Sequence, residues 1–285
     1  MRPPIIFTGM HRSGTSMIGR MLEALGLFVG LRKDENNEAL FFQEMNEWLL
    51  HQCGASWDDP TQLRKYFWRN EAVVGWSERY LRNLISSPRS ISFTGPMQYL
   101  KGGVNSLDTP WGWKDPRNTF ALPIWLKIFP DAKIIYIKRN GVDVAQSLRV
   151  RELKKLADAA RFYAKWQYVF FLRPRKGGFV GSSRCLELDD AFSLWREYIE
   201  EAEAVLSAVP SERLLRLRYE DVLDDPAAAI KIAVPFCGLS ATDEQINSIA
   251  GSVVRERSGA YEATPELRAF ASRHAAELRA VGYEP

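Results

Sequence analysis

A short glycine loop between an apolar run and an amphipathic segment constrains the fold of this chain more than any other feature. Residues 3–8 form the apolar run, which predicts a buried strand. From Ser16 to Leu27 the apolar residues recur at helical spacing, and Gly26 is a typical helix stop. The chain therefore opens as strand, tight loop and helix, an arrangement that can point backbone N–H groups and a helix N-terminus at a phosphate.

The loop from Gly9 to Ser16 matches the Walker-A frame, except that Thr15 stands where the lysine belongs. Its glycines allow the backbone to curl, and Ser13, Thr15 and Ser16 add hydroxyl donors. Arg12 can supply the missing cation from earlier in the loop. The missing lysine counts against an ordinary ATPase or GTPase, which uses it on the terminal phosphates. We expect this loop to bind a phosphate rather than to be a glycine turn without a ligand.

Strands and helices alternate along the rest of the chain. Residues 133–138 and 214–218 have the pattern of strands, and residues 91–93 that of a short strand. Helical patterns are found at residues 46–53, 78–85, 142–151, 192–208 and 227–236. This alternation predicts an α/β fold with a central parallel sheet flanked by helices. Ligands of such sheets bind at the carboxyl ends of the strands, which is where the best motifs lie.

Length, charge and cysteine content narrow the function further. A chain of 285 residues can form one large domain or two small ones, and we expect a single domain over residues 1–285. The 38 Lys+Arg against 35 Asp+Glu leave a net charge of only +3, which argues against a nucleic-acid partner. Three scattered cysteines make neither a disulfide framework nor a zinc site, so we expect a cytoplasmic protein without a metal.

The hydropathy pattern predicts no transmembrane segment. No apolar run approaches the roughly 18–20 residues that a bilayer span requires. The first seven residues carry one arginine and two prolines and do not resemble a signal peptide. Any membrane association is therefore expected to be peripheral.

The glycine loop reads Arg12-Ser13-Gly14-Thr15-Ser16, and directly after the first strand this resembles the 5′-phosphosulfate loop of sulfotransferases. These enzymes take their sulfuryl group from 3′-phosphoadenosine 5′-phosphosulfate (PAPS) and release PAP. The resemblance implies that the five residues bind this co-substrate and that the fold is a three-layer, P-loop-like one. Together with the motifs described next, it spans residues 5–226.

Two further segments resemble parts of the same family. Arg139 follows a strand and Ser147 lies eight residues later (147 − 139 = 8), as in the family's 3′-phosphate motif. A guanidinium makes a forked, charged clamp on phosphate oxygens. Tyr219 opens a Tyr-Glu-Asp segment similar to the one that lies beside the adenine. Without the resemblance, these would be a cationic strand end, a solvated serine and a helix start at Asp225–Pro226.

Sulfuryl transfer needs a cation that stabilises the charge on the departing phosphate. Arg12 and Lys114 are the two candidates. Lys114 lies in a Lys-Asp-Pro segment that resembles one in Golgi-type and many bacterial sulfotransferases, where the lysine is read as a stabiliser of the leaving group or transition state. Asp115 is expected to orient Lys114 or Arg117 rather than to act as a base. The alternative is that Lys114, Asp115 and Arg117 form a salt-bridge network with a structural role only.

A general base should take the proton of the acceptor. Glu38 stands eight residues before Asn46 (46 − 38 = 8), which is similar to the spacing of a glutamate in bacterial relatives. In those relatives an aromatic residue commonly precedes the glutamate, whereas here Asn37 does, so the assignment stays open. Glu44 and Glu47 are rivals that could simply be solvated. The Lys-x-His-Leu-Pro pattern is absent, which disfavours the cytosolic steroid- and phenol-type enzymes with their histidine base.

The resemblance thus implies a PAPS-dependent sulfotransferase that requires no metal. Its acceptor would be a hydroxyl, or less favourably an amine, of a carbohydrate, lipid or other small molecule. The alternative is a P-loop kinase that acts on a small molecule with Mg²⁺, and a third reading is a nucleotide-binding regulatory module without turnover. The sequence predicts neither the identity of the acceptor nor an oligomeric state.

Several remaining features have two interpretations each. His11, inside the loop, is expected to pack beside the phosphate. Aromatic clusters at residues 41–68 and 163–171 are either core or part of an acceptor pocket, and we favour core. The basic run at residues 173–176 is an exposed loop or a contact for an anionic acceptor. Arg255 and Arg257 lie where relatives place basic residues near the 3′-phosphate, although a solvated helix face is favoured.

Overall fold

The computed structural model describes residues 2–253 and 259–284, so Arg255 and Arg257 lie outside the described residues. The chain forms two compact units. Unit 1 contains residues 2–139 and 198–253, and unit 2 contains residues 140–197 and 259–284. The expectation of a single domain over residues 1–285 stays a prediction.

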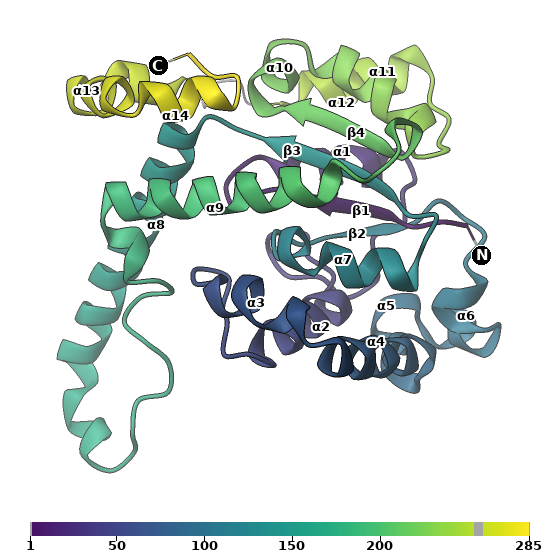
Figure 1. Cartoon of the computed structure of the whole chain (residues 1–285), viewed down its shortest axis with the longest axis horizontal. Coiled ribbons are helices and arrows are strands. Elements are labelled where there is room, and N and C mark those ends of the chain that lie inside the picture. Colours follow the sequence, from purple (N-terminus) through teal and green to yellow (C-terminus); the bar gives the residue numbers. More distant parts are fainter. Residues whose placement is uncertain (1, 254–258, 285) are drawn as a thin grey trace. The chain divides into compact units, whose positions relative to one another are not determined.

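Unit 1 is an α/β unit (Figure 1). Its strands are β1 (Ile5–Thr8), β2 (Gly112–Lys114), β3 (Lys133–Lys138) and β4 (Leu214–Arg218). Its α-helices are α1 (Thr15–Ala24), α2 (Leu40–His51), α3 (Thr61–Lys65), α4 (Glu71–Ser86), α5 (Ile91–Thr94), α6 (Pro96–Leu100), α7 (Asn118–Ile128), α10 (Tyr219–Asp224), α11 (Pro226–Phe236) and α12 (Asp243–Gly251). Short 3₁₀ turns are η1 (Phe67–Arg69), η2 (Pro88–Ser90), η3 (Gly103–Ser106) and η6 (Ser211–Arg213).

Unit 2 is helical among its described residues. It contains α8 (Gly141–Trp166), η4 (Gln167–Phe171), η5 (Arg184–Leu186), η7 (Ala260–Ala263), α13 (Pro265–Arg273) and α14 (Ala275–Ala280). Helix α9 (Leu188–Leu206) begins in unit 2 and ends in unit 1. Gly141 lies against Trp195 and Phe192, where a Cβ would come within 2.6 Å of the Trp195 ring, so only glycine allows α8 and α9 to approach this closely.

The four strands form one parallel sheet in the order β2-β1-β3-β4, which confirms the predicted α/β class. Alternate residues of β1 and β3, such as Phe7 and Ile137, pack with α1 and α11 in an apolar core. On the other face α7 contacts β1, and the hydroxyls of Thr8 and Thr119 are 2.9 Å apart. Helices therefore cover both faces of the sheet (Figure 1).

The structure corrects two expectations about local structure. Residues 91–93 are not a strand, because they belong to the short helix α5, in which the Thr94 hydroxyl donates to the Ser90 carbonyl. Phe93 is fully buried against Phe42 and Trp111, so burial rather than strand pairing explains its apolar pattern. Strand β2 was not predicted, since three residues are too short for a periodicity to be recognised.

The two aromatic clusters differ in burial. Phe41, Phe42 and Phe67 of the first cluster are buried, which confirms the core interpretation for them, whereas Tyr66 is 60% exposed. In the second cluster Tyr168 and Phe171 are 75% and 82% exposed, so the core interpretation is wrong there. Among the described residues, no helix combines the length and the apolar character that crossing a membrane would require.

Candidate active site

The carboxyl edge of the sheet gathers the predicted site residues of unit 1. Phe7 pairs with Lys114, Thr8 with Tyr136, and Lys138 with Arg218, so all four strands end at the same edge. The glycine loop follows β1, Lys114 ends β2, Arg139 follows β3 and Tyr219 follows β4. Neighbouring parallel strands lie about 4.8 Å apart, which brings these four segments together.

The loop after β1 depends on glycine at two positions. Gly9 and Gly14 have positive φ angles of 140° and 90°. A Cβ on Gly9 would lie 2.3 Å from the Ile137 carbonyl oxygen, and one on Gly14 would lie 2.2 Å from the Tyr219 ring. Arg12, between them, is also left-handed, with φ of 69°, a conformation that is uncommon for a residue with a side chain. The loop thus curls tightly between the end of β3 and the residue after β4.

Hydroxyl groups line the start of helix α1. Ser13 and Thr15 are buried and Ser16 is half-buried. The buried Ser13 Oγ has no hydrogen-bond partner among the described residues. The first turn of α1 carries no acidic side chain and no side-chain cap. A helix N-terminus of this kind favours an anion, because its free N–H groups and its dipole are both positive there. The Ser13 hydroxyl without a partner and the tight loop formed by Gly9 and Gly14 are therefore suited to binding a phosphate group.

Arg139 joins the loop to the segment after β4. Its side chain is buried, Nη1 donates to the Arg12 carbonyl oxygen at 3.1 Å, and the guanidinium lies 4.5 Å from the centre of the Tyr219 ring. The same ring faces Gly14. A guanidinium beside an aromatic face and a phosphate loop is suited to an aromatic phosphate compound. Ser147 lies half-buried on the second turn of α8 in unit 2, and its partnership with Arg139 stays a prediction.

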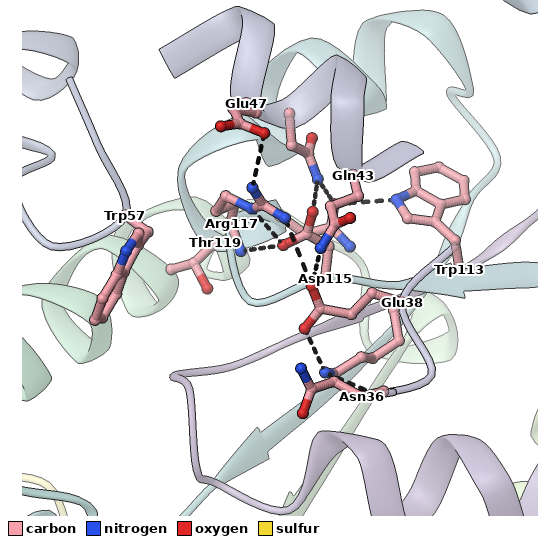
Figure 2. Close-up of polar contacts among 12 residues, drawn as sticks. Asn36, Glu38, Gln43, Glu47, Trp57, Trp113, Asp115, Arg117 and Thr119 are labelled. Carbon is pink, nitrogen blue, oxygen red and sulfur yellow. Dashed lines mark hydrogen bonds and ion pairs between the residues drawn. The ribbon is translucent and has the colours of Figure 1, made fainter. Parts of the chain in front are cut away.

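Glu38 and Lys114 form a buried ion pair at the end of β2. Lys114 Nζ donates to Glu38 Oε1 at 2.7 Å, and their side chains are only 4% and 6% exposed. The second oxygen, Glu38 Oε2, accepts from Gln43 Nε2 at 3.0 Å and lies 3.5 Å from Arg117 Nη2. Lys114 Nζ also lies 3.4 Å from the Asn36 carbonyl oxygen. Figure 2 shows Glu38 at the centre of these contacts. The two predicted catalytic residues are therefore in direct contact.

A second carboxylate, Asp115, is fully buried behind this pair. It accepts from the backbone N–H and Nε of Arg117, both at 2.9 Å, and from Asn46 Nδ2 at 2.9 Å (Figure 2). Of the two partners expected for Asp115, the structure shows the contact with Arg117. Asn46 Oδ1 accepts from Trp125 Nε1, and Asn118 Nδ2 donates to the Phe7 carbonyl. The network fixes α2 and α7 to the end of β1, as the interpretation of a structural salt-bridge network expects, and the catalytic role of Lys114 stays a prediction.

Burial is the largest influence on the Glu38 carboxyl. Together with the nearby Asp115 carboxylate, it raises the pKa of Glu38 above its ordinary value, while the Lys114 ammonium partly opposes this. A carboxylate with a raised pKa accepts a proton more readily than an exposed one. The rivals differ, because Glu44 and Glu47 are 62% and 56% exposed on α2. Burial separates Glu38 from both.

Sequence reasoning missed several residues that shape this site. Gln43 and Arg117 both reach the second oxygen of Glu38, but Gln43 belongs to no motif and Arg117 was expected only as a partner of Asp115. The only signal in the sequence was that Gln43 lies five residues after Glu38, so that the first turn of α2 can bring the two side chains together. The imidazole of His11 lies 4.7 Å from the Trp57 ring, in an edge-on contact that the sequence did not indicate. Arg12 is exposed at the surface of the loop.

We expect Gly14→Ala to damage the loop and to destabilise the protein by about 1–3 kcal/mol, because a Cβ there meets the Tyr219 ring and the residue keeps a left-handed conformation. Urea unfolding measures this change. The control is Gly75→Ala, at an exposed position inside α4 with no atom within 4 Å of the added Cβ. This control should gain about 0.5–1 kcal/mol. Equal stability of the Gly14→Ala variant and the parent protein would contradict the tight packing of the loop.

Comparisons with known proteins concern the family and the fold of this chain. The family model described as "Sulfotransferase family" matches residues 3–244. The fold is similar to the sulfotransferase domain from the curacin biosynthetic pathway, with 15% identity, a TM-score of 0.55 and coverage of 100% of this chain and 99% of that one. It is also similar to sulfotransferase STF1 from Mycobacterium tuberculosis, with 16% identity, a TM-score of 0.50 and coverage of 97% and 77%. At these identities the likeness concerns the fold. No curated protein matches the chain.

Proposed function

Because this chain belongs to the sulfotransferase family, we propose that it transfers the sulfuryl group of PAPS to a hydroxyl group of a carbohydrate, lipid or other small-molecule acceptor. An amine is the less favoured acceptor. The observation that carries the proposal is the meeting of the phosphate loop, Arg139, Tyr219 and the Glu38–Lys114 pair at one edge of the sheet.

The residues of the loop fit the 5′-phosphosulfate end of the co-substrate. Backbone N–H groups at Gly14 and the hydroxyls of Ser13, Thr15 and Ser16 are donors, and the orphaned Ser13 Oγ supports this assignment. Arg12 adds a cation on the exposed side of the loop. No acidic side chain of the first α1 turn opposes an anion there.

The nucleoside end of PAPS is assigned to the residues that follow β3 and β4. Arg139 binds the 3′-phosphate, with Ser147 as its proposed second ligand, and Tyr219 contacts the adenine. The buried guanidinium beside the Tyr219 ring supports this arrangement. Such a site would favour PAP over nucleotides that lack a 3′-phosphate.

PAPS supplies a sulfuryl group whose bond to the 5′-phosphate oxygen breaks as the acceptor oxygen attacks the sulfur. Glu38 takes the proton of the acceptor hydroxyl, and its burial, together with the nearby Asp115 carboxylate, raises its pKa above the ordinary value. Lys114 orients Glu38 and places a buried positive charge beside the loop, where negative charge develops on the departing phosphate. Arg117 and Gln43 hold the second Glu38 oxygen.

The kinase alternative is not favoured. The family match concerns sulfotransferases, and Thr15 replaces the lysine that P-loop kinases use on the terminal phosphates. A kinase would also need Mg²⁺ to bridge the phosphates of its nucleotide. Dependence on Mg²⁺ therefore separates the two functions.

We expect PAP to raise the melting temperature of the purified protein by several degrees, with or without Mg²⁺. A ligand at about one hundred times its dissociation constant adds about 2.7 kcal/mol to the free energy of unfolding. ADP should produce a much smaller shift under both conditions. Thermal unfolding with each nucleotide measures this, and transfer of labelled sulfate from PAPS in an acceptor screen then identifies the acceptor.

The Arg139→Ala variant tests the assignment within the same experiment, and it should lose most of the PAP shift. The control is Arg216→Ala, because Arg216 lies on the adjacent strand β4 and pairs with Glu203 instead. An equal PAP shift in both variants would refute the 3′-phosphate role of Arg139. Stabilisation by ADP only in the presence of Mg²⁺ would overturn the sulfotransferase proposal in favour of the kinase.

A further inference from the structure

Unit 2 carries a long helical arm that the proposed sulfuryl transfer does not use. We define the arm as residues 153–180, which contain the last turns of α8, η4 and the chain that returns from it (Figure 1). At its base, the fully buried Glu152 accepts from the backbone N–H groups of Gly181 and Ser182 at 2.6 and 3.2 Å. From Glu152 to Trp166 the helix rises about 21 Å, so η4 forms the tip of an anchored hairpin.

The tip of the arm exposes large apolar side chains. Tyr168, Phe171 and Leu172 are 75%, 82% and 87% exposed. Further exposed apolar residues follow the arm on both sides of the tip: Leu153, Phe162, Tyr163, Trp166, Val169 and Phe179. So many exposed aromatic and aliphatic side chains within one segment are unusual for a surface that faces only water, and they mark an interaction site.

The arm carries a net positive charge. Residues 159–186 contain no Asp or Glu. The arm as a whole has one acidic residue, Asp158, which pairs with Arg161. Against it stand seven basic residues: Lys154, Lys155, Arg161, Lys165, Arg173, Arg175 and Lys176. Because the whole chain has a net charge of only +3, the rest of the sequence is net negative. The positive charge is therefore concentrated where the aromatic side chains are exposed.

An open cleft of about 420 Å³ lies between α8 and the returning chain. Its lining includes Lys155, Phe162, Arg175 and Phe179, and also the Asp158 carboxylate, which pairs with Arg161. The Arg175 guanidinium lies 4.1 Å from the centre of the Phe179 ring, and its buried Nη1 has no hydrogen-bond partner among the described residues. A cation with a spare donor beside an aromatic ring fits a phosphate attached to an apolar group.

We propose that this arm docks on the surface of an anionic phospholipid bilayer. Tyr, Trp and Phe side chains favour the interface between headgroups and acyl chains, and nearby Lys and Arg side chains are attracted to anionic headgroups. The exposed tip at Tyr168, Phe171 and Leu172 enters the interface, and Arg173 and Lys176 remain at headgroup level. The partner proposed for the arm is thus an acidic membrane surface.

Co-sedimentation of the whole 285-residue chain with lipid vesicles tests this proposal. We expect binding to phosphatidylcholine vesicles that contain phosphatidylserine, and at least about tenfold weaker binding to vesicles of phosphatidylcholine alone. Raising the salt concentration should weaken the binding, because salt screens the attraction between the arm and the headgroups. Equal binding to both kinds of vesicle, or to neither, would overturn the proposal.

Two variants locate the binding surface. The double substitution Phe171→Ser with Leu172→Ser should weaken vesicle binding at least about tenfold, because it removes the apolar tip. Arg173→Glu with Lys176→Glu should have an effect of similar size on vesicles with phosphatidylserine. Neither should change the melting temperature or the shift caused by PAP, so this test is independent of the proposed function.

Matched controls use exposed residues of unit 1. Met97 and Leu100 of α6 are 71% and 79% exposed, so Met97→Ser with Leu100→Ser removes similar apolar surface away from the arm. Lys101→Glu with Lys127→Glu makes the same change in charge as the second variant. Controls that lose binding as strongly as the arm variants would overturn the proposal. So would a tip variant that keeps vesicle binding but dissociates a dimer in light scattering, since the arm would then contact a second copy.

Discussion

The Glu38→Gln variant is expected to lose about 10²- to 10⁴-fold in kcat, because an amide cannot take the proton of the acceptor. Glutamine has nearly the same shape, and its carbonyl oxygen can still accept from Lys114 Nζ. The variant should therefore bind PAP as the parent protein does. Steady-state kinetics with the identified acceptor measure the loss in kcat, and the thermal shift caused by PAP checks that the binding site is intact.

The pH dependence distinguishes a base from a structural residue. Burial and Asp115 raise the pKa of Glu38, and the carboxyl is active as a base only when it is deprotonated. Activity of the parent protein should consequently rise with pH through a pKa above the ordinary value of a glutamate, and this acidic limb should vanish in Glu38→Gln. A merely structural glutamate would lower activity without removing the limb.

Glu44→Gln is the matched control, because Glu44 lies on the neighbouring helix α2, is exposed and pairs only at the surface with Arg89. Its activity should equal that of the parent protein. Full activity of Glu38→Gln would refute the assignment of the base. A large loss in Glu44→Gln with none in Glu38→Gln would transfer the role to Glu44.

The Lys114→Met variant is expected to lose about 3–5 kcal/mol of unfolding free energy at neutral pH, because it leaves the Glu38 carboxylate buried without its closest cation. It should also lose transfer activity, since the positive charge beside the loop disappears. Urea unfolding measures the first effect. The double variant Glu38→Gln with Lys114→Met should recover part of the stability, as the buried charge is then removed too.

The loss in this variant should depend on pH. Without the ammonium, the pKa of Glu38 in the folded state rises further above its value in the unfolded chain. A group with a raised folded-state pKa contributes stability below its unfolded pKa, and this contribution is lost as the pH rises through the folded-state pKa. The difference between the Lys114→Met variant and the parent protein should therefore be small in acid and grow toward neutral pH.

Lys33→Met is the control, because Lys33 pairs with Glu23 in a partly exposed position. Breaking a partly exposed pair should cost less than about 1 kcal/mol. An equally small cost in Lys114→Met would show that the Glu38–Lys114 pair is not held in a buried environment, and it would remove the physical basis for the raised pKa of Glu38.

Several parts of the fold could be predicted because they depend on local patterns. The apolar run before the glycine loop is β1, and the runs at residues 133–138 and 214–218 are β3 and β4 with the predicted bounds. Asp225 accepts from the Ala228 N–H at the start of α11, as its position before Pro226 suggests. In each case residues that are adjacent in the sequence are sufficient to predict the strand or the start of the helix.

The errors arose where distant contacts override a local pattern. Phe93 has the apolar character of a strand residue, yet aromatic packing against Phe42 and Trp111 places it in a helix. Helix α8 continues from the predicted end at Arg151 to Trp166. The aromatic residues of this extension are of the types that usually form a core. Only their solvent exposure, which the sequence does not give, shows that the segment is an arm.

The sequence by itself determined the chemical components of the site: a glycine loop between a strand and a helix, an arginine after the third strand, a tyrosine after the fourth, and a family resemblance that the comparisons bear out. Only the tertiary structure decided that β2 lies beside β1 with Lys114 opposite Phe7, and that Glu38, 76 residues away in sequence, pairs with Lys114. Parallel strand pairing and buried ion pairs join residues that are distant in the chain, so no local pattern encodes them. Burial, which separates Glu38 from its two exposed rivals, likewise exists only in the folded chain.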